Sequence, residues 1–138
     1  MRLSIFFCKN ARCTDYNQLD SAIIYGNRAL KLLHAGNDIP SLLTVHNNLS
    51  KVYRKQGQYD KAVDYCLKGI RIAEKEQYKS RLANSYMSLG NVFMEMGDFK
   101  KAKSYHDQSA AVYIRNNDTL GLASYYNEIG LGFSRQKQ

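Results

Sequence analysis

The fourteen residues from Leu49 to Ala62 read LSKVYRKQGQYDKA, and the stretch forty positions later, Leu89 to Ala102, reads LGNVFMEMGDFKKA. Both stretches carry leucine first, an aromatic residue fifth, glycine ninth, another aromatic residue eleventh and alanine last. A pattern that recurs at a fixed offset indicates a repeat architecture, in which each unit packs on its neighbours in sequence. The sequence therefore predicts a stacked array of similar units.

The repeat extends beyond these two stretches in both directions along the chain. Residues 19–25 read LDSAIIY, which matches YDKAVDY at 59–65 and FKKAKSY at 99–105. A second set of positions recurs at the same offset, and consists of Leu42, Leu82 and Leu122, of Leu49, Leu89 and Ile129, and of Tyr53, Phe93 and Phe133. Nearly all of the 138 residues therefore follow one forty-residue period.

Apolar residues within each unit recur three or four positions apart, which places them on one face of an α-helix. These stripes predict helices near residues 18–35, 42–56, 59–76, 82–96, 99–116 and 121–135, with a degenerate first helix within 3–14. Gly57 and Gly97 follow predicted helix ends, where a left-handed residue can close a helix. Cys66 lies in an apolar stripe, which predicts a buried, inert thiol.

Two positions of the repeat predict how the helices pack. Alanine recurs at Ala22, Ala62 and Ala102, and a side chain of this size lets two helices approach closely. Tyrosine follows three residues later in each unit, at Tyr25, Tyr65 and Tyr105. A fixed place in the repeat predicts that these tyrosines pack in the core.

The pattern resembles the tetratricopeptide repeat, since leucine, aromatic, glycine and alanine residues stand at that family's positions in both stretches quoted above. The resemblance implies an all-α fold, a right-handed superhelical stack of antiparallel helix hairpins. The usual repeat has about 34 residues. The forty-residue unit therefore looks like the long repeats of kinesin light chains, of the spindle adaptor that binds G-protein α subunits, and of bacterial signalling regulators. HEAT-type repeats share this length but fit the alanine, glycine and aromatic positions worse.

These units form one expected domain over residues 1–138. It comprises a partly degenerate repeat at about 3–38, full repeats at about 42–78 and 82–118, and a half repeat at 121–135. The last helix has no second helix to complete its hairpin. We therefore expect this end either to continue into further repeats or to self-associate through 121–135.

Composition narrows the possible environments and partners. Twenty Lys and Arg against twelve Asp and Glu give a formal charge of +8, which favours acidic partners at long range. The basic residues are spread along the chain without a recognition motif, so nucleic acid is not the expected partner. Three cysteines without framework spacing indicate free thiols and a cytoplasmic location. No stretch approaches the roughly 18 apolar residues of a membrane span.

No catalytic constellation is present in the sequence. It contains no glycine-rich phosphate loop, no nucleophile motif and no metal-ligand spacing. The carboxylate pairs Asp60 with Asp64 and Glu74 with Glu76 are interpreted as solvated helix surface. We therefore expect a protein that is not an enzyme and that has no catalytic residues, metal or cofactor.

In the tetratricopeptide family, function resides in a concave groove lined mainly by the first helix of each hairpin. By the helical period, the face not used for packing carries Asn47, Lys51, Arg54, Lys55, Asn84, Met87, Asn91, Met94 and Asn127. Asparagine can donate and accept hydrogen bonds with a peptide backbone. The three basic residues would form a positive patch for a carboxylate or phosphate, and the two methionines an adaptable, exposed apolar surface. The alternative interpretation is ordinary solvent-facing helix surface.

The family also includes a carboxylate clamp for chaperone C-terminal peptides, built on Lys followed four residues later by Asn. Asn47 and Lys51 reverse that order, and the next repeat has Met87 and Asn91, so chaperone binding is not predicted. The leading hypothesis is a scaffold that binds a protein or peptide segment with acidic and apolar side chains. The alternative is the sensory or regulatory portion of a larger bacterial signalling or transcription regulator. A nucleic-acid-binding solenoid is a third, weaker hypothesis, which salt dependence would distinguish.

Overall fold

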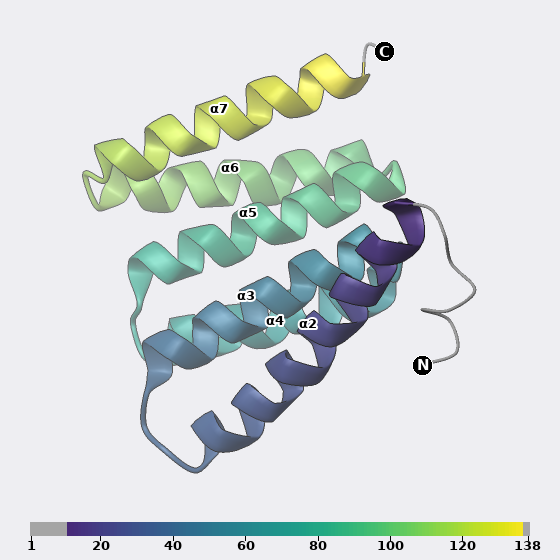
Figure 1. The fold of residues 1–138 in the computed structure, drawn as a ribbon. Helices are drawn as coiled ribbons and strands as arrows, with labels where there is room; N and C mark the ends of the chain where they lie inside the picture. The colour runs from purple at the N-terminus through teal and green to yellow at the C-terminus, as the bar shows by residue number, and fades with distance from the viewer. Residues whose placement is uncertain (1–10, 137–138) are drawn as a thin grey trace.

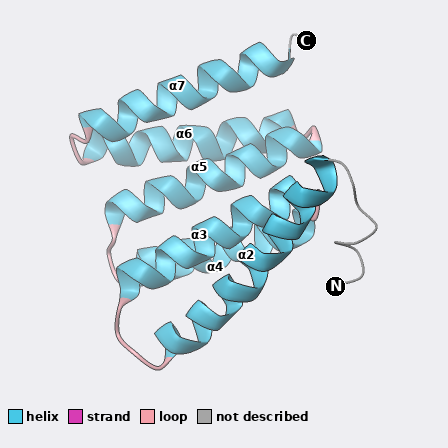
Figure 2. Cartoon of the chain, viewed as in Figure 1, coloured by secondary structure: helices cyan, strands magenta, loops and turns pink. Residues whose placement is uncertain are grey.

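The computed structural model describes residues 11–136, and every regular element in this range is a helix. The elements are α2 (Ala11–His34), α3 (Ile39–Lys55), α4 (Tyr59–Lys75), α5 (Lys79–Met96), α6 (Phe99–Arg115) and α7 (Thr119–Gln136). They follow one another as antiparallel neighbours joined by short loops (Figures 1 and 2). Because α3, α5 and α7 begin at residues 39, 79 and 119, the helices reproduce the forty-residue period. The predicted all-α solenoid is confirmed.

The loops close the helices with local hydrogen bonds and left-handed residues. Asp38 and Asp98 cap α3 and α6, since their side chains accept hydrogen bonds from the backbone N–H groups of Ser41 and Lys101. Gly57 and Gly97 have φ angles of +77° and +86°, which confirms the predicted left-handed turns. The loops between hairpins use the same device, with Gln77 and Asn117 at positive φ.

Three helices begin earlier than predicted. α3 begins at Ile39 instead of residue 42, because Pro40 fits the first turn of a helix, where its missing N–H costs nothing. α5 begins at Lys79 instead of 82, and α7 at Thr119 instead of 121. The loops that join successive hairpins therefore have only three or four residues, and those within a hairpin have two or three.

The first described helix also differs from the expectation, since α2 begins at Ala11 instead of near residue 18. Residues 11–14 extend α2, and the remainder of the degenerate helix expected within 3–14 lies outside the described residues. Tyr65 stacks on Tyr53, twelve residues earlier in the preceding helix. The residue twelve positions before Tyr25 is Cys13, which belongs to α2 itself. Tyr25 consequently has no such partner and is 65% exposed, so its predicted core position is wrong.

The core lies both within and between the hairpins and uses the small residues of the repeat. Ala62 and Ala102 are 0% and 1% exposed, as their repeat position predicts. At the crossing of α3 and α4, Ser50 Oγ donates a 3.0 Å hydrogen bond to the carbonyl oxygen of Ala62. Leu89 and Val92 of α5 are completely buried against α4 and α3. Close helix approach at these points is what fixes the stack.

The last helix packs less closely than its predecessor. Tyr125 of α7 stands at the repeat position of Ser85 in α5, and its ring lies edge-on to His106 of α6 with centroids 6.5 Å apart. Figure 1 shows α7 diverging from α6 toward the C-terminus. A slot of about 320 Å³ separates the two helices, and its lining includes Met94, Ala102, Ile129 and the same Tyr125. The slot shows that α7 packs less closely on α6 than α5 packs on α4.

Candidate functional site

A polar hollow of about 150 Å³ lies across the face formed by α3, α5 and α7, which we call the central hollow. Its lining consists of Asn47, Lys51, Asn84, Met87, Ser88, Asn91, Tyr113, Ser124, Tyr125 and Glu128. Five of the residues predicted from the sequence are among them, namely Asn47, Lys51, Asn84, Met87 and Asn91. The first helix of each successive hairpin thus contributes to one shared surface.

The asparagines of the central hollow are oriented by hydroxyl groups of neighbouring helices. Ser88 Oγ donates a 2.5 Å hydrogen bond to Asn47 Oδ1. Tyr113 Oη, which reaches across from α6, donates a 2.6 Å hydrogen bond to Asn84 Oδ1. In both residues the carbonyl oxygen is engaged and the amide NH₂ group is left without a bond to any described residue. With the Lys51 ammonium, these groups make the hollow rich in hydrogen-bond donors.

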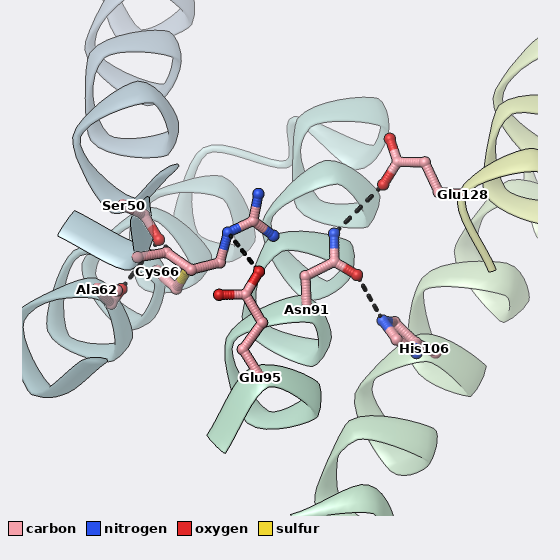
Figure 3. Close-up of polar contacts among 8 residues, drawn as sticks. Ser50, Ala62, Cys66, Asn91, Glu95, His106 and Glu128 are labelled. Atoms are coloured by element: carbon pink, nitrogen blue, oxygen red, sulfur yellow. Dashed lines mark hydrogen bonds and ion pairs between the residues drawn. The ribbon is translucent and has the colours of Figure 1, made fainter. Parts of the chain in front are cut away.

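Asn91 joins two helices through a chain of three polar side chains (Figure 3). Its Nδ2 donates to Glu128 Oε2 at 3.3 Å, and its Oδ1 lies 3.0 Å from His106 Nε2. A carboxylate can only accept, so the amide nitrogen must face Glu128 and the amide oxygen must face His106. The neutral His106 ring therefore carries its proton on Nε2. This chain holds α7 to α5 and α6 beside the hollow.

Arg54 does not contribute a free cation to the predicted positive patch. Its Nε lies 3.5 Å from Glu95 Oε1, and its side chain is only 19% exposed. Glu95, which Figure 3 labels, comes from α5 and is the acidic partner in this contact. Lys51 and Lys55 remain exposed, but only Lys51 lines the central hollow. The patch of three cations is therefore reduced to one lysine at the hollow and one beside it.

The two predicted methionines differ from the exposed pair that the sequence suggested. Met87 lines the floor of the central hollow but is only 6% exposed, because Tyr113 and Tyr125 pack over it in one core cluster. Met94 is partly buried and lines the slot between α6 and α7 instead. Asn127 is exposed on α7 and does not line the hollow. An exposed methionine surface is therefore not present at these positions.

Five lining residues are absent from the set predicted from the sequence, namely Ser88, Tyr113, Ser124, Tyr125 and Glu128. Ser88 and Glu128 lie four residues after Asn84 and Ser124, so a helical face rotated by one position would have included them. Tyr113 belongs to α6, the second helix of its hairpin, and sequence periodicity assigns it to the core. Its hydroxyl group nevertheless reaches the hollow, where it donates a hydrogen bond to Asn84.

Cys66 confirms the prediction of a buried thiol. Its side chain is 3% exposed, and Ser50 Oγ lies 2.7 Å from its sulfur atom. Burial raises the pKa of the thiol to about 11, so it stays protonated at neutral pH and is a poor nucleophile. No cluster of three or more His, Cys, Asp or Glu side chains suited to a metal occurs within the described part of the chain. None of the helices described is long and apolar enough for a membrane span.

Two buried histidines predict that stability falls in acid. Burial lowers the pKa of His46 and of His106 below the ordinary value of 6.5. The unfolded chain therefore takes up protons near that value while the folded chain resists them. We expect the free energy of unfolding to decrease as the pH falls below about 6.5. Melting temperatures at neutral and mildly acidic pH would measure this, and His106→Gln should reduce the acid sensitivity. An unchanged pH profile in that variant would contradict the assignment.

Stacked helix hairpins with a polar hollow along their first helices define a solenoid of the tetratricopeptide class. The family described as the SusR N-terminal TPR domain matches residues 14–128, and the chain belongs to this family. The resemblance to tetratricopeptide repeats is therefore confirmed. Its particular likeness to the long-repeat varieties stays a prediction.

The known proteins that are similar to this chain include a bacterial regulatory protein and a protein of known structure. Regulatory protein RapG of Bacillus subtilis (strain 168) is 25% identical over 87 residues, which cover 62% of this chain and 24% of RapG. The crystal structure of BtubC (BKLC) from P. vanneervenii matches with a TM-score of 0.65 and 20% identity, over 88% of this chain and 49% of that chain. The structural likeness shows the fold alone. The chain spans about a quarter of RapG and about half of BtubC.

Proposed function

We propose that the chain is a protein-binding scaffold whose central hollow recognises an extended segment of a partner. The observation that carries this proposal is the donor-rich lining. Asn47 and Asn84 engage their amide oxygens internally and leave NH₂ groups for a ligand, and Lys51 adds a positive charge. Such groups suit peptide carbonyl oxygens and an acidic side chain or carboxylate. The formal charge of +8 would attract the same kind of segment at long range.

The binding surface is a site of recognition, and the chain is proposed to perform no chemistry. Cys66 is buried with a raised pKa, and the ring nitrogens of His46 and His106 bond to Leu42 and Asn91 within the fold. The hollow itself contains amide, hydroxyl, ammonium and carboxylate groups but none of these titratable core side chains. Its polar contacts would therefore provide affinity and orientation for a bound segment.

A second candidate function is the regulatory portion of a larger protein. The match to a protein named as regulatory, of which this chain spans about a quarter, favours it. In this proposal the central hollow still binds a segment, and the binding event would be passed to a further domain. The two proposals share the same site and differ in the length of the native gene product.

The central hollow can be tested with a displayed library of random peptides selected on the wild-type chain. We expect the selected peptides to be enriched in Asp and Glu, and Lys51→Glu to weaken their binding at least about tenfold, or roughly 1.4 kcal/mol. Lys51 is changed alone because Arg54→Glu would place a second carboxylate against Glu95.

Lys100→Glu provides a matched control, since it makes the same change of charge at an exposed position on α6. We expect this variant to bind the selected peptides like the wild type. Equal losses in both variants would show a general electrostatic effect and contradict the assignment of the hollow. Binding to single-stranded RNA with a steep linear dependence on the logarithm of salt concentration would instead support the nucleic-acid hypothesis.

A further inference from the structure

An apolar cleft lies between α2 and α3. These two helices stand at the end of the stack opposite α7 (Figure 1). The cleft has a volume of about 310 Å³ and is lined by Ala22, Tyr25, Gly26, Val45, Asn48, Leu49 and Val52. Tyr25 is 65% exposed, and Ala22 is exposed as well. We call this surface the α2/α3 cleft.

The same surface occurs one repeat later, where another helix covers it. The positions forty residues further on are Ala62, Tyr65, Cys66, Ser85, Ser88, Leu89 and Val92, and all of them except the partly buried Tyr65 are buried. The covering helix is α3. Its Tyr53 stacks on Tyr65 with ring centroids 5.4 Å apart, and its Asn47 accepts a hydrogen bond from Ser88. The α2/α3 cleft therefore has the form of a docking site for a helix equivalent to α3.

α7 is such a helix, and one of its faces has no partner among the described residues. α3, α5 and α7 occupy the same place in successive repeats. Gly130 of α7 corresponds to Ser50 of α3, which is buried against α4. A Cβ atom at Gly130 would meet nothing within 4 Å, and the nearby Tyr126 is 62% exposed.

The register of the repeat pairs the exposed groups of α7 with those of the α2/α3 cleft. His46 packs beside Tyr65 at 5.9 Å, and Tyr86 beside Tyr105 at 6.3 Å. Tyr126 follows His46 and Tyr86 in the first series, and Tyr25 precedes Tyr65 and Tyr105 in the second. Each is therefore the unpaired half of a contact that the molecule makes twice. The small residues Gly130 and Ala22 likewise stand at the crossing where Ser50 meets Ala62.

A polar contact extends the same match. Tyr65 Oη donates a 3.3 Å hydrogen bond to Asn27 Oδ1, which lies on the second helix of the preceding hairpin. If α2 of a second copy followed α7 in the same register, the hydroxyl group of its Tyr25 would point toward Asp107 of α6 in the first copy. Asp107 is exposed and makes no ion pair with any described residue. A carboxylate there can accept the hydrogen bond.

We propose that α7 of one molecule docks in the α2/α3 cleft of a second copy, so that the second copy continues the repeat array of the first. The two surfaces are different, and the contact is therefore heterologous. Such a contact leaves one free cleft and one free α7 on every pair, and assembly proceeds to open chains or rings instead of ending at a dimer. Apolar surface that the described residues leave uncovered on α7 and at the α2/α3 cleft provides the driving force.

Sedimentation velocity of the full chain across a dilution series tests this assembly. We expect the mass to rise with concentration from one chain to two and more. Tyr25→Glu and Tyr126→Glu should each stay at the mass of a single chain, with unchanged helicity. An equimolar mixture of the two variants should form dimers that grow no further, because each variant retains the one intact surface that the other needs.

Leu120→Glu serves as the control, since it removes an apolar residue of α7 that is even more exposed than Tyr126 and lies outside the proposed contact. This variant should assemble like the wild type. A wild-type chain that is monomeric at all concentrations would overturn the proposal and would indicate that another segment covers the cleft. If both glutamate variants lost assembly and mixing did not restore it, the pairing would be symmetric, between like surfaces. That outcome would also overturn the proposal.

Discussion

Replacing Ala62 or Ala102 by leucine is expected to destabilise the fold by about 1–3 kcal/mol at each site, the usual cost of overpacking a filled core. Ala62 is 0% exposed and packs in one cluster with Leu49, Tyr53 and Val92. The carbonyl oxygen of Ala62 also accepts the hydrogen bond from Ser50 of α3. Three additional carbon atoms cannot be placed there without separating α3 from α4.

Chemical denaturation followed by circular dichroism would measure both variants. Ala22→Leu provides a control at the same repeat position, because Ala22 is exposed in α2. In dilute solution, this control should change stability by less than about 0.5 kcal/mol. If Ala62→Leu were as stable as Ala22→Leu, the close contact of α3 with α4 would be wrong.

Sequence alone predicted the features that depend on local pattern. Apolar periodicity located all six described helices, and the predicted turns at Gly57 and Gly97 have the expected left-handed conformation. Both signals act within one or two turns of helix. Gln77 shows the limit of this reasoning, since glutamine has no preference for positive φ. It adopts the same helix C-terminal turn as Gly57, in which the following N–H, that of Tyr78, donates a 2.9 Å hydrogen bond to the carbonyl oxygen of Ala73.

The candidate site was less predictable because its contacts join different repeats. Whether Met87 is exposed depends on Tyr125, which lies in the following repeat and covers it. Arg54 is neutralised by Glu95, a residue of the next hairpin. Helical periodicity separates a packed face from a free face on one helix. It does not show that α5 is contacted by four helices, α3, α4, α6 and α7.

The same dependence on neighbours explains why the ends of the array differ from its middle. Tyr25 and Tyr65 share one repeat position, yet only Tyr65 has an aromatic partner in a preceding helix. A repeat position therefore predicts what a residue can contact, while the presence of the adjacent helix decides whether the contact forms. Surfaces left open in this way at both ends are the ones proposed to join two copies.

Gly90 and Gly130 occupy equivalent repeat positions and are expected to respond to alanine in opposite directions. At Gly90 a Cβ atom would lie 2.6 Å from His106 Nε2, and His106 is 3% exposed and bonded to Asn91. The ring would have to move, so Gly90→Ala should lose about 1–3 kcal/mol through overpacking. At Gly130 nothing lies within 4 Å, and alanine there should gain about 0.5–1 kcal/mol because it restricts the unfolded chain.

Thermal unfolding of both variants in dilute solution would measure this difference. A change of 1 kcal/mol corresponds to roughly 3–5 °C in melting temperature for a chain of this size. Gly90→Ala should therefore melt several degrees below the wild type and Gly130→Ala a few degrees above it. Because both substitutions have the same intrinsic effect on a helix, the difference between them isolates the contact with His106. Equal shifts in the two variants would mean that His106 does not pack against Gly90.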